Sequence, residues 1–217
     1  MTGTGRERLT GQIEVDEAFY GGLTPGKRGR GSAGKTLVGA AVERRGSRMG
    51  RIRMQVLASA SAGDLARFLG ATVAPGATVV TDGWVSYPPA ATAASVTHEP
   101  HVVAGSGEQA HVILPGVHRV FSLSKRMLEG TYQDGMQARH LQAYLDEFVF
   151  RFNRRTATHR GMLFFRLLEH AVSAAPAPYR DLVAAPGAKE RPRPRTGRRA
   201  QPATLTGQPL DRPWRHA

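Results

Sequence analysis

The stretch GQIEVDEAFY, residues 11–20, determines how the rest of the chain is interpreted. Its apolar and polar residues alternate, which is the period of a half-buried β-strand. Asp16 lies within this alternation, and Glu14 and Glu17 are its acidic neighbours. The stretch therefore predicts a first strand that carries at least one carboxylate.

Two more strands are predicted directly after the first. The segment TLVGAAVE (36–43) is short and rich in residues that favour strands, and RRGSRMG after it has the glycines and serine of a turn. The segment RIRMQVLASA (51–60) alternates again. Three consecutive strands joined by such connections predict an antiparallel meander.

The pattern then changes to one helix and a fourth strand. Ser61 is a candidate N-cap for a helix through DLARFLGATV, and the Pro75–Gly76 pair ends that helix. The segment ATVVTDGW (77–84) predicts a buried strand that ends at Asp82. The stretch SYPPAATAASVTHEPHVVAGSGEQ after it shows no period and is predicted to be irregular.

Helices are predicted for the remainder of the ordered chain. One begins near Leu114 and runs through VHRVFSLSKRMLEG, a second covers ARHLQAYLDEFVFRFNRR, and a third covers GMLFFRLLEHAVSAA. The elements together predict an α/β domain over residues 11–175, after a flexible N-terminus at 1–10. Residues 186–217 hold eight Lys and Arg against two acids among many prolines, so they predict a disordered basic tail.

The charge of the chain points to a polyanionic partner. Its 217 residues include 30 Lys and Arg against 17 Asp and Glu, a net charge of +13. Such an excess favours binding to nucleic acid through its phosphates. The chain has no cysteine, which excludes disulfides and thiol chemistry, and it shows no signal peptide and no membrane-length apolar run. A soluble cytoplasmic protein with no membrane partner is expected.

One motif suggests nucleotide binding, and its flanks argue against it. The string GRGSAGKT (29–36) fits the phosphate-loop pattern at every fixed position. A working phosphate loop lies between a buried strand and the N-terminus of a helix. Here the preceding segment is glycine-rich and basic, and the following one is a predicted strand. A basic loop that binds no nucleotide cofactor is therefore expected, with a phosphate-loop protein as the lesser alternative.

Two aspartates occupy strand positions that can converge. Asp16 lies on the first predicted strand and Asp82 at the end of the fourth. Carboxylates on neighbouring strands can hold divalent cations, which prefer oxygen ligands and can promote phosphodiester chemistry. Residue types alone leave Glu14 and Glu17 open as competitors of Asp16.

Five strings in register resemble a known family. GQIEVDEAFYGG, GKTLVGAAVE, TDGWVSY, LSKRMLEGTY and HLQAYLDEFVFRFNRR look like the DDE-type transposases of bacterial insertion sequences. The group that they resemble carries a zinc ribbon and a helix-turn-helix ahead of a compact DDE domain, and this chain lacks that N-terminal part. The resemblance implies a ribonuclease H-like fold: three antiparallel strands, a helix, further strands, then helices.

By position, the resemblance implies that Asp16 and Asp82 are the first two metal-binding acids. Counting back seven residues from Lys125 in the LSKR string places His118 at the third position, where the family has an acid. An imidazole suits Mn²⁺ better than Mg²⁺. The implied site is therefore Asp16, Asp82 and His118 with two Mg²⁺ or Mn²⁺ ions, and Lys125 contacts DNA from the same helix face.

The resemblance also implies the partners. These are DNA, as transposon ends and target, and further copies of the chain in a synaptic complex. The expected DNA-binding residues are Lys35, Arg126, Arg151, Arg154 and Arg155. Two departures, the histidine at position 118 and the missing N-terminal part, keep a second hypothesis open: an inactive remnant that binds only DNA or a partner transposase.

Overall fold

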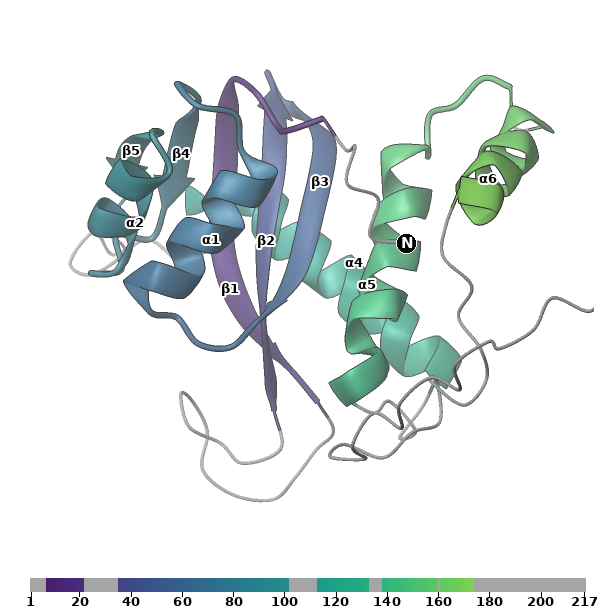
Figure 1. Ribbon diagram of the computed structural model, residues 1–217, viewed down its shortest axis with the longest axis horizontal. Coiled ribbons are helices and arrows are strands. Elements are labelled where there is room, and N and C mark those ends of the chain that lie inside the picture. Colours follow the sequence, from purple (N-terminus) through teal and green to yellow (C-terminus); the bar gives the residue numbers. More distant parts are fainter. Residues whose placement is uncertain (1–6, 22–34, 102–112, 133–137, 160, 174–217) are drawn as a thin grey trace, which may run out of the picture. The chain divides into compact units, whose positions relative to one another are not determined.

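The computed structural model describes residues 7–21, 35–101, 113–132, 138–159 and 161–173. It shows a five-stranded sheet in the order β3-β2-β1-β4-β5 (Figure 1). β1 pairs antiparallel with β2, β2 antiparallel with β3, and β4 and β5 run parallel to β1. The predicted three-stranded meander is confirmed. The strands are β1 Gln12–Tyr20, β2 Thr36–Arg45, β3 Arg48–Leu57, β4 Thr78–Thr81 and β5 Thr97–Pro100.

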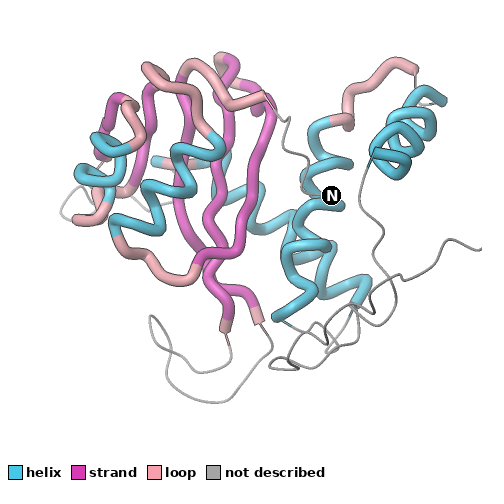
Figure 2. Tube along the Cα trace, in the orientation of Figure 1, coloured by secondary structure: helices cyan, strands magenta, loops and turns pink. Residues whose placement is uncertain are grey.

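Helices cover both faces of this sheet (Figure 2). One apolar core joins a sheet face to α1 and α2, and a second core joins the opposite face to α4 and α5. The alternation in β1 explains this division, because successive side chains of a strand point to opposite faces. The helices are α1 Ala62–Thr72, α2 Tyr87–Ala93, α4 Pro115–Tyr132, α5 Leu141–Asn153, which follows a 3₁₀ turn at Ala138–His140, and α6 Gly161–Ser173.

This order of strands and helices confirms the expected α/β, ribonuclease H-like fold. Ser61 is the N-cap of α1, as predicted, and its hydroxyl accepts a hydrogen bond from the Asp64 amide. In β2 the residues from Leu37 to Glu43 are all buried. A strand inside a sheet that is covered on both faces has this near-continuous apolar pattern.

The stretch predicted to be irregular after Asp82 contains two elements. α2 begins at Tyr87 and has prolines in its first turn, and β5 occupies Thr97–Pro100. Proline is well tolerated at the start of a helix, because the first amides have no intrahelical acceptor there. The YPP sequence therefore opens a helix, and the prediction of an irregular connection was wrong for these residues.

Two side-chain amides of α5 bind the backbone of β3, the last strand of the sheet. Gln142 accepts a hydrogen bond from the Val56 amide at 2.8 Å and donates to the Met54 carbonyl at 3.3 Å. Asn153 accepts from the Ile52 amide at 2.8 Å and donates to the Ile52 carbonyl at 3.1 Å. These contacts satisfy backbone groups that no further strand pairs with, and they fix α5 to the sheet.

The chain divides into two units, Met1–Ala174 and Ala175–Ala217. The predicted tail at 186–217 lies outside the described residues. In the predicted flexible N-terminus, Leu9 is fully buried and bridges Val73, so order begins before residue 11. No helix in the described part of the chain is long and apolar enough to cross a membrane. α6 exposes several large apolar side chains, among them Phe164 and Phe165.

Candidate active site

The two predicted aspartates lie on β1 and just after β4, the strand parallel to it. The register of β1 and β4 pairs Gln12 with Thr78 and Glu14 with Val80. Asp16 is two residues beyond Glu14 on β1, and Asp82 is two residues beyond Val80. Asp82 follows the last residue of β4, where Gly83, with φ of +81°, turns the chain away. The Asp82 carboxylate accepts a hydrogen bond from the Trp84 amide at 3.1 Å, which orients it at the strand end.

His118 lies beside Asp16. Its Nε2 atom is 3.8 Å from the Asp16 Oδ2 atom, with 32% of the histidine side chain and 15% of the aspartate side chain exposed. The histidine stands near the start of α4, and the aspartate is in the middle of β1. The structure therefore brings together two of the three predicted ligands, and the third directly follows the neighbouring parallel strand β4.

Glu14 fixes the start of α4 against β1. Its carboxylate is buried, accepts a hydrogen bond from the Val117 amide at 2.8 Å and lies 3.5 Å from the Arg44 guanidinium. Gly116 makes the contact possible, because a Cβ atom there would come within 2.9 Å of the same carboxylate. A negative charge at a helix N-terminus is favourable. The Glu14 side chain therefore holds the helix that carries His118 in position.

Glu17, the other competitor of Asp16, points to the opposite face of the sheet. It accepts a hydrogen bond of 2.6 Å from the buried Tyr87 hydroxyl. Burial raises the pKa of Tyr87, and the charges of Glu17, Asp16 and Asp82 raise it further. With Glu14 and Glu17 both engaged, Asp16 is the acid of β1 best placed to face a substrate.

The donor chemistry of this site fits a divalent cation. Asp16 and Asp82 supply hard carboxylate oxygens, and the imidazole of His118 suits Mn²⁺ and similar ions. Among the described residues, no three His, Asp or Glu side chains are gathered closely enough to hold an ion. The residue types therefore suit the expected Mg²⁺ or Mn²⁺. The described side chains are not close enough together to coordinate an ion.

Lys125 lies further along α4, above the ring of Tyr20. Its ammonium is 5.2 Å from the ring centre, and the Tyr20 hydroxyl is hydrogen-bonded to Ser124 at 2.6 Å. Burial lowers the pKa of Lys125, Glu129 opposes that shift, and the charge of Lys35 lowers the pKa further. Lys35 directly precedes Thr36, which pairs with Tyr20 across β1 and β2. The two predicted DNA-contacting lysines therefore both lie at the Tyr20 end of β1.

The other predicted DNA-binding residues are scattered over α4 and α5. Arg126 is exposed beside Lys125 on α4. Arg151 forms an ion pair with Glu147 at 2.7 Å, and Arg154 lies over the Phe150 ring at 3.9 Å. Arg155 donates hydrogen bonds to the carbonyls of Met49, Gly50 and Phe152. Of these four, Arg155 is the one that ties α5 to the β2–β3 hairpin.

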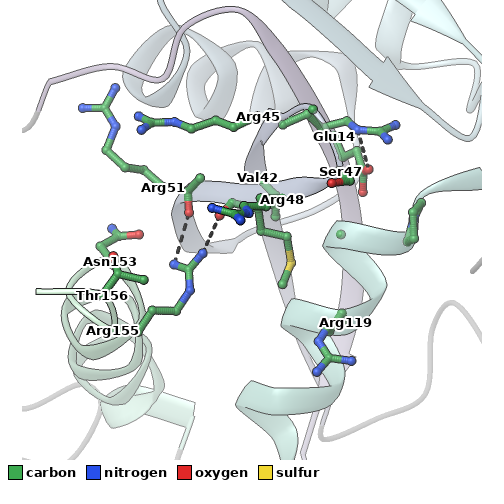
Figure 3. Close-up of a pocket in the computed structure, with 16 residues that line it drawn as sticks. Glu14, Val42, Arg45, Ser47, Arg48, Arg51, Arg119, Asn153, Arg155 and Thr156 are labelled. Carbon is green, nitrogen blue, oxygen red and sulfur yellow. Dashed lines mark hydrogen bonds and ion pairs between the residues drawn. The ribbon is translucent and has the colours of Figure 1, made fainter.

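Sequence reasoning did not single out a pocket at the tip of the β2–β3 hairpin, here called the arginine pocket. Its volume is about 1030 Å³, and arginines reach it from the hairpin, from α4 and from α5 (Figure 3). The available signal was the density of arginine in ERRGSRMGRIR, residues 43–53. The arginines that line it are Arg44, Arg45, Arg48, Arg51, Arg119 and Arg155.

Glu43 fixes the position of Arg51, one of the arginines that line the arginine pocket. Its buried carboxylate accepts hydrogen bonds from the Arg51 guanidinium, with the shortest at 2.7 Å, from the Arg51 amide and from the Thr10 amide. Burial alone would raise the pKa of Glu43, but the hydrogen bonds from Arg51 and Thr10 outweigh it and lower the pKa to about 2.

We expect Glu43 to stabilise the fold most strongly above pH 4.5. Its pKa is lower in the folded chain than its ordinary value of 4.5, so the stabilisation is complete above 4.5 and declines as pH falls toward 2. Two and a half pKa units correspond to about 3 kcal/mol. In urea unfolding, Glu43→Gln should cost about that much at pH 7 and about half near pH 3. A cost that stays constant across this range would contradict the expectation.

The phosphate-loop pattern does not have the flank that it needs. Residues 22–34 lie outside the described residues, but Thr36, the last position of the pattern, opens β2. A strand therefore follows the pattern, as predicted, where a nucleotide-binding loop requires the N-terminus of a helix.

Comparisons with known proteins give one family. The profile of the ISXO2-like transposase domain matches residues 8–153. Among solved structures, the chain is similar to one from a cryo-EM structure of the simian T-cell lymphotropic virus intasome in complex with PP2A regulatory subunit B56 gamma. The identity is 12% and the TM-score 0.42, over 86% of this chain and 69% of that chain. No curated protein matches the sequence.

Proposed function

Because the chain belongs to the ISXO2-like transposase domain family, we propose that it is the catalytic domain of a transposase acting on insertion-sequence ends. The observation that carries the proposal is that His118 lies 3.8 Å from Asp16 of β1, while Asp82 directly follows β4, the strand that pairs parallel with β1. Convergent carboxylates on neighbouring strands are suited to metal-assisted phosphodiester chemistry.

Each residue of the site has a proposed role. Asp16, Asp82 and His118 would hold Mg²⁺ or Mn²⁺, which would supply activation of a nucleophile and stabilisation of the leaving oxygen of a phosphodiester. Lys125 binds a DNA phosphate, and the positive charge of Lys35 adds to the electrostatic attraction of the same DNA strand. Glu14 keeps His118 in place by binding the first turn of α4.

The proposed reaction has two steps on DNA. Water attacks the phosphodiester at the transposon end, and cleavage leaves a 3′-hydroxyl on the element. That hydroxyl then attacks a phosphodiester of target DNA. The new bond joins the element to the target's 5′ phosphate, and the bond that breaks releases a 3′-hydroxyl on the other target end. Further copies of the chain assemble with both ends during these steps.

The proposal is tested by incubating the full chain with duplex DNA that carries the sequences flanking its gene, where the element's ends lie. We expect nicks that leave a 3′-hydroxyl in Mn²⁺, weaker nicking in Mg²⁺ because of the imidazole ligand, and none with a chelator. Nicks are mapped on a sequencing gel, and the 3′-hydroxyl is identified by polymerase extension. Cleavage that persists in chelator would contradict the proposed chemistry.

A second candidate function is supported by the residue at position 118. A histidine stands beside Asp16, where the resemblance implies an acid. An inactive transposase remnant that still binds DNA would retain the fold and the basic surface. Salt-sensitive DNA binding without nicking in Mg²⁺ or Mn²⁺ would favour this candidate over the enzyme.

A further inference from the structure

We infer that the arginine pocket binds the DNA backbone immediately beside the reacting phosphodiester, an inference that rests on the proposed function. The pocket lies next to the aspartate site. Glu14, which lines it, is two residues before Asp16 on β1, about 7 Å away at the rise of a strand. Arg119, which also lines it, directly follows His118 on α4.

The pocket and the lysine pair lie on opposite sides of the candidate active site. α4 runs alongside β1, since Val117 contacts Glu14, His118 contacts Asp16, and Ser124 contacts Tyr20. The arginine pocket lies at the start of this alignment, and Lys125 lies at its end, over Tyr20. A strand bound at both basic sites would therefore cross Asp16, which is the path that a reacting phosphodiester requires.

The lining of the pocket has a surplus of positive charge. Six arginines line it, and three of them, Arg44, Arg45 and Arg51, form ion pairs with the carboxylates of Glu7, Glu14 and Glu43, so the positive charges exceed the negative ones by three. Arg48 and Arg119 form no ion pair or side-chain hydrogen bond with any other described residue. Their guanidinium groups can each bind a phosphate through two parallel hydrogen bonds.

The size and composition of the pocket fit a DNA backbone better than a small molecule. Its volume of about 1030 Å³ is at the upper limit of small-ligand sites, which are lined mainly by apolar and aromatic groups. This pocket has no aromatic residue in its lining, and its apolar side chains are Val42, Met49 and Pro115. An extended polyanion matches such a lining, because each phosphate can occupy a separate arginine.

The inference is tested by the salt dependence of DNA binding in the double variant Arg48→Ala/Arg119→Ala. Each lost phosphate contact lowers the slope of log K against log salt by about 0.9, so the slope should become shallower by about 1.8. Arg48→Lys/Arg119→Lys keeps both charges and should keep the slope. The matched control is Arg67→Ala/Arg166→Ala, which removes two exposed, ion-paired arginines from α1 and α6.

The outcomes separate this inference from the proposed function, because nicking is measured on the same proteins. A shallower slope in the double alanine variant alone supports the inference, whether or not the wild type nicks DNA. An unchanged slope, or an equal change in the control, overturns it even if nicking is observed. Thermal melting of all variants shows whether the fold is retained.

Discussion

Replacing Asp82 with asparagine should abolish metal-dependent nicking and leave the fold and DNA binding intact. Asparagine keeps the side-chain oxygen that accepts the hydrogen bond from the Trp84 amide, so the turn after β4 is retained. It loses the negative charge with which the Asp82 carboxylate would attract a divalent cation. Because even residues that only support a metal ligand contribute 10–100-fold, we expect a loss of more than about a hundredfold.

The measurement is the rate of nicking in Mn²⁺, with DNA affinity followed in parallel. Affinity should be unchanged or slightly higher, since the variant has one negative charge fewer. Glu169→Gln on α6 is the matched control, because it removes an equal charge from an exposed carboxylate. Nicking by Asp82→Asn at the wild-type rate would rule out the proposed catalytic site.

Replacing Glu14 with alanine should lower the free energy of unfolding by about 3 kcal/mol and also slow nicking. The change leaves the Val117 amide without its acceptor, removes the ion pair with Arg44 and opens a cavity under α4. Removing one partner of a buried ion pair costs about 3–5 kcal/mol. The lower end applies here, because 37% of the Arg44 side chain is exposed and can be hydrated.

Two further variants separate the position of α4 from a general charge effect. Glu14→Gln keeps an oxygen for the Val117 amide and should recover part of both stability and nicking rate. Glu129→Ala removes an exposed carboxylate from the same helix and should change stability by less than about 0.5 kcal/mol. Urea unfolding gives these values. A loss below 1 kcal/mol in Glu14→Ala would show that Glu14 does not fix the helix.

The elements with a clear local signal could be predicted from the sequence. The alternation in residues 11–20 gave β1, and the serine at position 61 gave the start of α1. α2 was missed because its stretch shows no apolar period, and its two prolines occupy the first turn of the helix. β5 was missed because it is four residues long and mostly exposed, so it carries no apolar period.

The candidate site depends on contacts that no local pattern contains. The period of β1 puts Glu14 and Asp16 on one face and Glu17 on the other, but it does not say which carboxylate is already engaged. That answer comes from two tertiary contacts: the Val117 amide of α4 donates a hydrogen bond to Glu14, and the Tyr87 hydroxyl donates one to Glu17. The parallel pairing of β1 with β4, which brings the segments of Asp16 and Asp82 together, joins residues more than sixty positions apart, such as Glu14 and Val80.

The amides of Gln142 and Asn153 have a consequence for how copies of this chain can associate. A strand at the end of a sheet is a template on which another chain can pair, in functional dimers or in aggregates. On β3, however, the outward backbone groups of Ile52, Met54 and Val56 are already hydrogen-bonded to α5. An incoming strand would have to displace both amides. Strand addition at β3 is thereby blocked, and an assembly of copies must be built through other surfaces.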